Sequence, residues 1–156
     1  MKKKAKSRKS KMSNSITKKR EMRKVVFESL FQLAIEKVDL ERLFFTFETL
    51  NRRSPLEKAY YEEARTYIED IYKNLNQYDE LIEKYSEGWS FERIGNVEKT
   101  VMRIFIYELF NKKQIPVKVI LNEATELTKT YASQKSAAFV NGIMDNVARS
   151  INPIIS

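Results

Sequence analysis

The chain has 156 residues and a formal net charge of +8 at pH 7, a size that suits one ordinary domain or two small bundles sharing a core. It contains no cysteine, no histidine and only three glycines. These absences exclude a disulfide framework, a thiolate nucleophile, the usual serine-hydrolase relay and glycine-rich phosphate loops, and they remove most zinc or iron sites. An enzyme is therefore disfavoured, and no cofactor is expected. Apolar runs are far shorter than a membrane-spanning helix, so no membrane partner is expected either.

Positive charge is concentrated at the start of the chain. Residues 1–24 hold 12 basic side chains and a single acid, Glu21, whereas the rest of the chain is slightly acidic. Residues 1–15 are rich in lysine and serine and lack core-forming side chains, which predicts a disordered basic tail before a helical domain over residues 16–152. A cationic arm on such a body indicates a polyanionic ligand. A tail that only keeps the protein soluble is the alternative.

The first half of the domain has the apolar spacing of helices. A first helix is expected from Thr17 to about Ala34, and Asp39 is a suitable N-cap for a second. Ser54–Glu57 has the pattern of a capping box with proline at the first helical position, which predicts the start of a long third helix. A fourth is expected over residues 76–86. An apolar connector that contains Trp89, Phe91 and Ile94 follows it.

The second half predicts three more helices. The segment 97–111 is apolar on most of its circumference and is expected to be the central helix, surrounded by the others. Pro116 opens the next helix, and Ser133 caps the last. Inside the last helix, Gly142 indicates either a close approach between helices or no special role. No stretch of the chain alternates with a period of two, so the fold class is all-α, with about seven helices.

The candidate nucleic-acid surface begins with basic residues that open the first helix. They are Lys18, Lys19, Arg20, Arg23 and Lys24. Helical spacing puts Arg20, Arg23 and Lys24 on one stripe, which is suited to lie along a phosphate backbone. Phe27 and Phe31 follow on the same helix and are candidates for stacking on unpaired bases, with core packing as the alternative.

The polar turn before the last helix is the second part of this surface. Free backbone N–H groups and the positive end of the helix dipole favour an anion there, and Lys135 adds charge. An ordinary N-cap at Ser133 is the alternative. The last helix is not expected to read DNA, because Ala137 and Val140 stand where polar base-reading side chains would be needed.

Acidic residues offer a competing interpretation. The pairs that resemble acid–base or metal sites are Glu62 with Glu63 and Glu123 with Glu126. Without histidine or cysteine beside them these acids are expected to be solvated, which disfavours a small hydrolase. Glu98, Arg103 and Glu108 interrupt the apolar helix, and they are either paired inside the bundle or displayed to a partner.

A series of motifs in the second half resembles one known family. The motifs are Trp89-Ser90-Phe91-Glu92-Arg93-Ile94, Val97-Glu98-Lys99, Met102-Arg103-Ile104, Tyr107-Glu108-Leu109, Ile115-Pro116, Asn122-Glu123-Ala124, Glu126-Leu127 and Phe139-Val140-Asn141-Gly142. In this order and spacing they resemble the NusB family of bacterial transcription antitermination factors, over about residues 17–150. The N-terminal half matches only in character, as a basic segment that leads into a helix.

The resemblance implies two packed helical bundles and a cytoplasmic, non-catalytic RNA-binding adaptor. Its RNA would be the single-stranded boxA element of ribosomal RNA leaders, and its protein partner NusE, the small-subunit ribosomal protein that doubles as a Nus factor. The complex would act on RNA polymerase, and homodimers are expected for some relatives. A helical protein-interaction module without specific RNA binding is the alternative.

The resemblance also implies site residues by position. The RNA surface would consist of Lys19, Arg20, Arg23, Phe31, Lys135, Ser136 and Phe139. NusE would lie along the face that contains Glu92 and Glu98. Two positions depart from the family pattern, because Glu28 stands where relatives often carry glutamine and Lys135 replaces a frequent acid.

Overall fold

The computed structural model describes the backbone of residues 2–151 and the side chains of residues 14–151. The elements are α1 Lys2–Leu30, α2 Gln32–Ile35, α3 Leu40–Arg53, α4 Lys58–Lys73, α5 Leu75–Lys84, the 3₁₀ turn η1 Phe91–Arg93, α6 Asn96–Asn111, α7 Val117–Tyr131 and α8 Gln134–Ile151. No strand occurs in residues 2–151, which confirms the all-α class. The seven expected helices are present, and the short α2 is an additional turn after the first.

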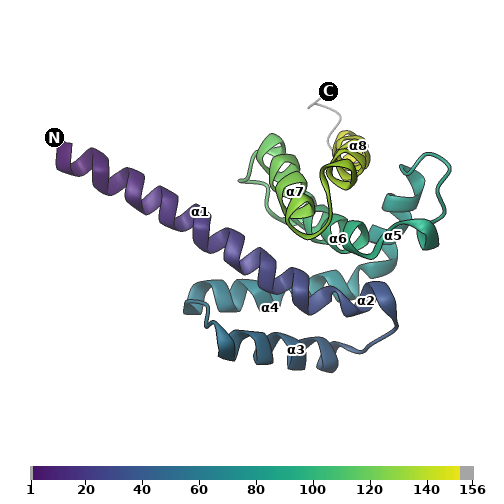
Figure 1. Ribbon diagram of the computed structural model, residues 1–156, viewed down its shortest axis with the longest axis horizontal. Helices are drawn as coiled ribbons and strands as arrows, with labels where there is room; N and C mark the ends of the chain where they lie inside the picture. The colour runs from purple at the N-terminus through teal and green to yellow at the C-terminus, as the bar shows by residue number, and fades with distance from the viewer. Residues whose placement is uncertain (1, 152–156) are drawn as a thin grey trace.

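The N-terminal helix is longer than expected. It was predicted to begin near Thr17, but α1 begins at Lys2 and includes most of the predicted tail. Neither glycine nor proline interrupts residues 2–30, and lysine, alanine and methionine are good helix formers. In Figure 1 the first turns of α1 project away from the other helices, so local propensity is their main support. Disorder in this segment stays a prediction, and the expected domain end at residue 152 lies outside the described residues.

Two groups of helices share α6. Helices α1, α3 and α4 pack against one another, α7 and α8 form a hairpin, and α6 contacts both groups and α5. Figure 1 shows α3 and α4 on one side of α1, and α7 and α8 on the other. One apolar cluster runs through both groups, with Phe47, Tyr67 and Phe105 among its largest fully buried side chains. The two packed bundles are therefore confirmed, and they share one core.

The central position of α6 is also confirmed. Every residue from Lys99 to Leu109 is buried, because neighbouring helices cover it on several sides. A helix of this kind buries charged residues along with apolar ones, and each buried charge then needs a partner. Within residues 2–151 no helix combines the length and the apolar character needed to cross a membrane.

The N-caps predicted at Asp39 and Ser133 are confirmed. Asp39 accepts a hydrogen bond of 2.8 Å from the backbone N–H of Arg42 at the start of α3. Ser133 accepts one of 3.1 Å from the backbone N–H of Ser136 at the start of α8. Both caps satisfy an N–H group that has no partner within its own helix.

The capping box predicted at Ser54–Glu57 is wrong. Helix α3 continues to Arg53, and Ser54 closes it by donating its backbone N–H to the carbonyl oxygen of Leu50. Helix α4 begins only at Lys58, with Glu57 as its N-cap residue. The proline therefore lies in the connection between helices, where the side chain of Asn51 accepts a hydrogen bond of 2.9 Å from the backbone N–H of Leu56.

The observed backbone also decides between the two interpretations of Gly142. A Cβ atom added at Gly142 meets no atom within 4 Å, so no neighbouring helix approaches it closely. The glycine is exposed on α8 and leaves open space there.

Candidate nucleic-acid interface

Lys18 and Lys19 fasten α1 to the beginning of α4. The Lys18 Nζ atom lies 2.5 Å from Oε1 of Glu57, and the Lys19 Nζ atom lies 2.6 Å from Oε1 of Glu63. Lys112, just after α6, approaches the same Glu63 oxygen at 3.2 Å. Burial alone would raise the pKa of Glu63, but the two lysines hold this pKa below its ordinary value. These two predicted RNA contacts, Lys18 and Lys19, are thus ion-paired with carboxylates at the start of α4.

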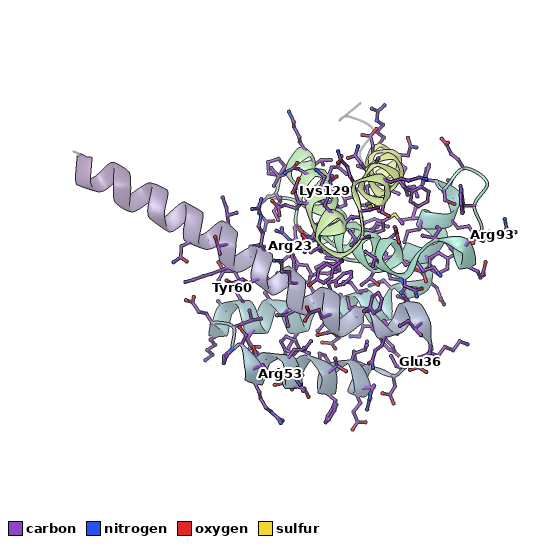
Figure 2. All side chains as sticks on the ribbon, in the orientation of Figure 1. Arg23, Glu36, Arg53, Tyr60, Arg93 and Lys129 are labelled. Atoms are coloured by element: carbon purple, nitrogen blue, oxygen red, sulfur yellow. The ribbon has the colours of Figure 1, made fainter. Side chains whose placement is uncertain are left out.

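Arg23 lies inside the molecule, which corrects the exposed position expected from its helical spacing. Its guanidinium group donates two hydrogen bonds, of 2.8 and 2.9 Å, to the Glu108 carboxylate on α6. Tyr67 donates a third, of 3.0 Å, to Oε2 of Glu108, and the ring of Phe105 lies beneath the guanidinium group. Figure 2 shows Arg23 where α1 passes between the two groups of helices. The buried Glu108 carboxylate requires this positive charge.

Arg20 and Lys24 remain on the surface. Arg20 binds both oxygens of Glu123 on α7, at 2.8 and 3.0 Å, while half of its side chain stays exposed. The hydrogen bond to Glu123 raises the pKa of Arg20 above its ordinary value. Lys24 is exposed, and it makes no ion pair within the part of the chain whose side chains are described.

Phe31 lies next to the end of α7, as part of an aromatic group. Its ring is half-buried and tilts against Phe27, with the ring centres 5.7 Å apart. Phe27 is buried and stacks on Tyr131 at 4.1 Å, so core packing is its role. The Tyr131 hydroxyl donates a 3.1 Å hydrogen bond to Glu28, and burial together with this carboxylate raises the pKa of Tyr131. These contacts bring the C-terminal part of α1 to the α7–α8 turn.

The α7–α8 turn displays its charge to solvent. Lys135 is exposed and has no ion-pair partner among the described side chains. Ser136 is half-buried, and its hydroxyl oxygen lies 3.1 Å from that of Ser133. The turn therefore combines an accessible cation with hydroxyl groups at a helix N-terminus, where an anion is favoured.

Phe139, one turn farther along α8, faces a tryptophan that the sequence analysis did not select as a site residue. The rings of Phe139 and Trp89 meet edge to face with their centres 6.1 Å apart, and half of Trp89 is exposed. They line a hollow of about 300 Å³ that also includes Gly142. The turn before Trp89 holds Glu87 and Gly88 at φ angles of 48° and 88°, a conformation rare for a residue other than glycine. The signal available in the sequence was the single tryptophan of the chain, directly after a glycine in a connector.

The predicted partner residues Glu92 and Glu98 differ in accessibility. Glu92 is exposed in η1, whereas Glu98 is half-buried in the first turn of α6. A Cβ atom at Gly95 would lie 2.1 Å from Oε2 of Glu98. The Glu98 carboxylate thus folds back over the N-terminus of α6, where the helix dipole favours a negative charge.

The remaining charges of α6 are internal. Arg103 donates hydrogen bonds of 2.8 and 2.9 Å to Asp79 on α5. Lys99 places its Nζ atom 4.5 Å from the ring centre of Phe91. Burial lowers the pKa of Lys99, and the positive charge of Arg103 lowers it further. Of the three charges left open by the sequence, Arg103 and Glu108 are paired inside the bundle.

The acids that resembled catalytic pairs are solvated only in part. Glu62 and Glu126 are exposed as expected, whereas Glu63 is half-buried and Glu123 is buried, which corrects the expectation for these two. Glu63 and Glu123 are ion-paired to α1, and Glu126 lies 3.4 Å from Lys129 on its own helix. No group of three or more metal-ligating side chains occurs in the described part of the chain.

The comparison with family models decides the classification. A model of the NusB family matches residues 20–149. The chain belongs to the NusB family. It is 35% identical over 139 residues to the transcription antitermination protein NusB of Fervidobacterium nodosum, an alignment that covers 88% of this chain and 95% of that protein. The match to the family begins at Arg20, so Lys18, Lys19 and the basic segment before them lie outside it.

Solved NusB structures share this fold. One of Thermotoga maritima NusB is similar to this chain with a TM-score of 0.72 and 38% identity, covering 84% of this chain and 90% of that one. A structure of the antitermination factors NusB and NusE in complex with double-stranded RNA gives a TM-score of 0.75 at 24% identity, with coverage of 86% and 98%. The arrangement of α1 to α8 is thus the NusB fold.

Proposed function

We propose that this chain is a non-catalytic, cytoplasmic RNA-binding adaptor of transcription antitermination that recognises boxA RNA of ribosomal RNA leaders jointly with NusE. Its membership of the NusB family over residues 20–149 carries the proposal. The relative whose structure was solved with NusE and double-stranded RNA supports the two kinds of partner. The complex would act on RNA polymerase.

The contact surface that we propose spans α1 and the α7–α8 turn. Arg20 and Lys24 would meet phosphates, Phe31 and Phe139 would contact bases, and Lys135 with Ser136 would hold a further phosphate at the start of α8. Each of these side chains is exposed or only partly buried, which supports this assignment.

Three of the predicted contacts receive a different role. Lys18, Lys19 and Arg23 would hold α1 in position, because their charges are engaged by Glu57, Glu63 and Glu108. The basic residues before Asn14 would then supply much of the sequence-independent attraction to RNA.

For NusE we propose the face around η1 and the N-terminus of α6. Glu92 is displayed there and would meet the partner directly, whereas Glu98 would act mainly by ordering the start of α6.

The test is competition binding of labelled boxA RNA against a shuffled RNA of equal length, at physiological salt, with and without NusE. We expect preference for boxA, and we expect NusE to increase it. Equal binding of both RNAs in the presence of NusE would overturn the proposal and favour a protein-interaction module.

A further inference from the structure

Between α1 and α7 the surface contains a hollow of about 170 Å³. Arg20, Arg23 and Lys24 line it from α1, and Glu123, Glu126 and Thr130 line it from α7. Arg23 is held by Glu108, so Arg20 and Lys24 are the two cations accessible to a ligand. Beside them lie two carboxylates and the Thr130 hydroxyl, which donates to the backbone oxygen of Glu126. The size and donors of the hollow suit one phosphate group.

Glu123 contacts Arg20 more closely than it contacts Arg23. Its carboxylate binds Arg20 through two oxygens, and it also lies 3.6 Å from Nη1 of Arg23. Arg23 is buried and is held by Glu108 as well. If Arg20 leaves, Glu123 therefore keeps a positive neighbour, and no carboxylate becomes buried without compensation.

Arg20 is the member of this group that is free to move. Half of its side chain is exposed, against 6% for Arg23. A guanidinium group binds carboxylate and phosphate with the same two-pronged geometry. Glu123 is buried, but it keeps Arg23 at 3.6 Å when Arg20 exchanges one anion for the other, so we expect the net cost of the exchange to be small.

We propose that this hollow is a phosphate site for RNA and that Glu123 is the internal competitor for it. In the free protein the Glu123 carboxylate binds Arg20. In the complex a phosphodiester group takes both donors of Arg20, with Lys24 and the Thr130 hydroxyl beside it, and Glu123 remains next to Arg23. Competition of this kind lowers the affinity for every RNA by the same factor, so only an RNA that also makes base contacts binds tightly. This inference rests on the proposed RNA-binding function and names a contact within it.

The test compares Glu123→Gln with Glu126→Gln in boxA binding by the full chain. Both carboxylates line the hollow and both changes remove one negative charge from α7, but only Glu123 is hydrogen-bonded to Arg20, whereas Glu126 pairs with Lys129. We expect about fivefold tighter binding for Glu123→Gln and at most about twofold for Glu126→Gln. In an Arg20→Ala background, the advantage of Glu123→Gln over Glu126→Gln should vanish.

Arg20→Ala alone provides a second test, which leaves the buried pair of Arg23 and Glu108 intact. It should weaken boxA binding about fivefold and reduce the slope of log affinity against log salt by ~0.7. Thermal unfolding of each variant checks that it is folded. The site is disproved if Arg20→Ala leaves affinity and slope unchanged, or if the two glutamine variants bind equally.

The outcome also separates this inference from the function on which it rests. A parent chain that prefers boxA while the variants behave alike overturns only the phosphate site. A parent chain that does not distinguish boxA from shuffled RNA overturns the proposed function and the site with it.

Discussion

The basic part of α1 and the α7–α8 turn both carry basic side chains, but most of those on α1 are ion-paired and the one at the turn is not. Lys18, Lys19 and Arg23 each face a carboxylate that lies between 39 and 85 residues away in the sequence. Lys135 has no such partner among the described side chains. The number of cations in a segment therefore does not give the charge available to a ligand. Acids on neighbouring helices decide it.

This contrast divides the positive residues of the chain into two kinds. Cations paired with α4 and α6 are expected to affect stability. Unpaired cations are expected to affect RNA binding and its dependence on salt, and so is Arg20, which is paired with Glu123 but half exposed. Variants from each region test this division.

The largest expected effect is on stability, from Arg23→Ala. The change leaves Glu108 buried without its cation, so we expect the free energy of unfolding to fall by about 3–5 kcal/mol in chemical denaturation. Arg20→Ala is the matched control on the same helix, and it should cost at most about half as much, because Arg20 is half exposed and Arg23 stays beside Glu123. Combining Arg23→Met with Glu108→Leu and Tyr67→Phe should recover most of the loss, because no buried charge or hydroxyl donor of this group is then left without a partner. Equal losses for the two alanine variants would show that burial of its ion pair does not make Arg23 more important for stability than Arg20.

Deletion of residues 2–13 is expected to have the largest effect on RNA binding. This segment holds seven basic side chains, and each phosphate contact contributes ~0.7 to the salt slope on a single strand. We expect the slope to fall by about 2–5 while the thermal stability of the body is unchanged. A variant with residues 2–13 in scrambled order should keep the parent slope, since this attraction is independent of sequence. An unchanged slope after deletion would show that the tail serves only solubility.

Lys135→Ala should have a smaller effect. Loss of one accessible cation at the turn is expected to weaken boxA binding about threefold and to reduce the salt slope by ~0.7. Lys73→Ala on α4, where the lysine pairs with Glu69, is the control and should change neither quantity. Stability should be unaffected in both. If the two lysine variants behave alike, the α7–α8 turn is not part of the RNA-binding surface.

The smallest expected effect concerns Glu63. Because its pKa in the folded chain is below the ordinary value of 4.5, its contribution to stability is present above that value and is lost as pH falls through the folded pKa. Glu63→Gln should therefore lower stability by less than about 1 kcal/mol at neutral pH, and the difference from the parent should shrink below about pH 4. Urea denaturation at pH 7 and pH 3 measures this. A difference independent of pH would mean that the two lysines do not act through the Glu63 charge.

Features decided within a few residues were predictable. The caps at Asp39 and Ser133 depend on one side chain and a backbone N–H three positions later. The central role of α6 followed from a segment that is apolar on nearly every side. The wrong start at Ser54 shows the limit of such signals, because the same tetrapeptide pattern occurs where one helix ends and the next has not begun.

The candidate site was predictable in part. Helical spacing correctly placed Arg20 and Lys24 at the surface, and the motifs of the second half correctly indicated the family. Spacing shows which side chains share a helix face, but not what covers that face, so Arg23 was misplaced. Trp89 was overlooked as a site residue because its exposure depends on the turn at Glu87 and Gly88 and on the position of α8.

By itself, then, the sequence determined the helical class, the central helix, two of the caps and the family. Each of these depends on residues that are close together in the chain or on motifs read in order. Only the tertiary structure decided which cations are ion-paired within the molecule and which face solvent. An ion pair forms between groups that the fold brings within about 4 Å, however far apart they are in the sequence.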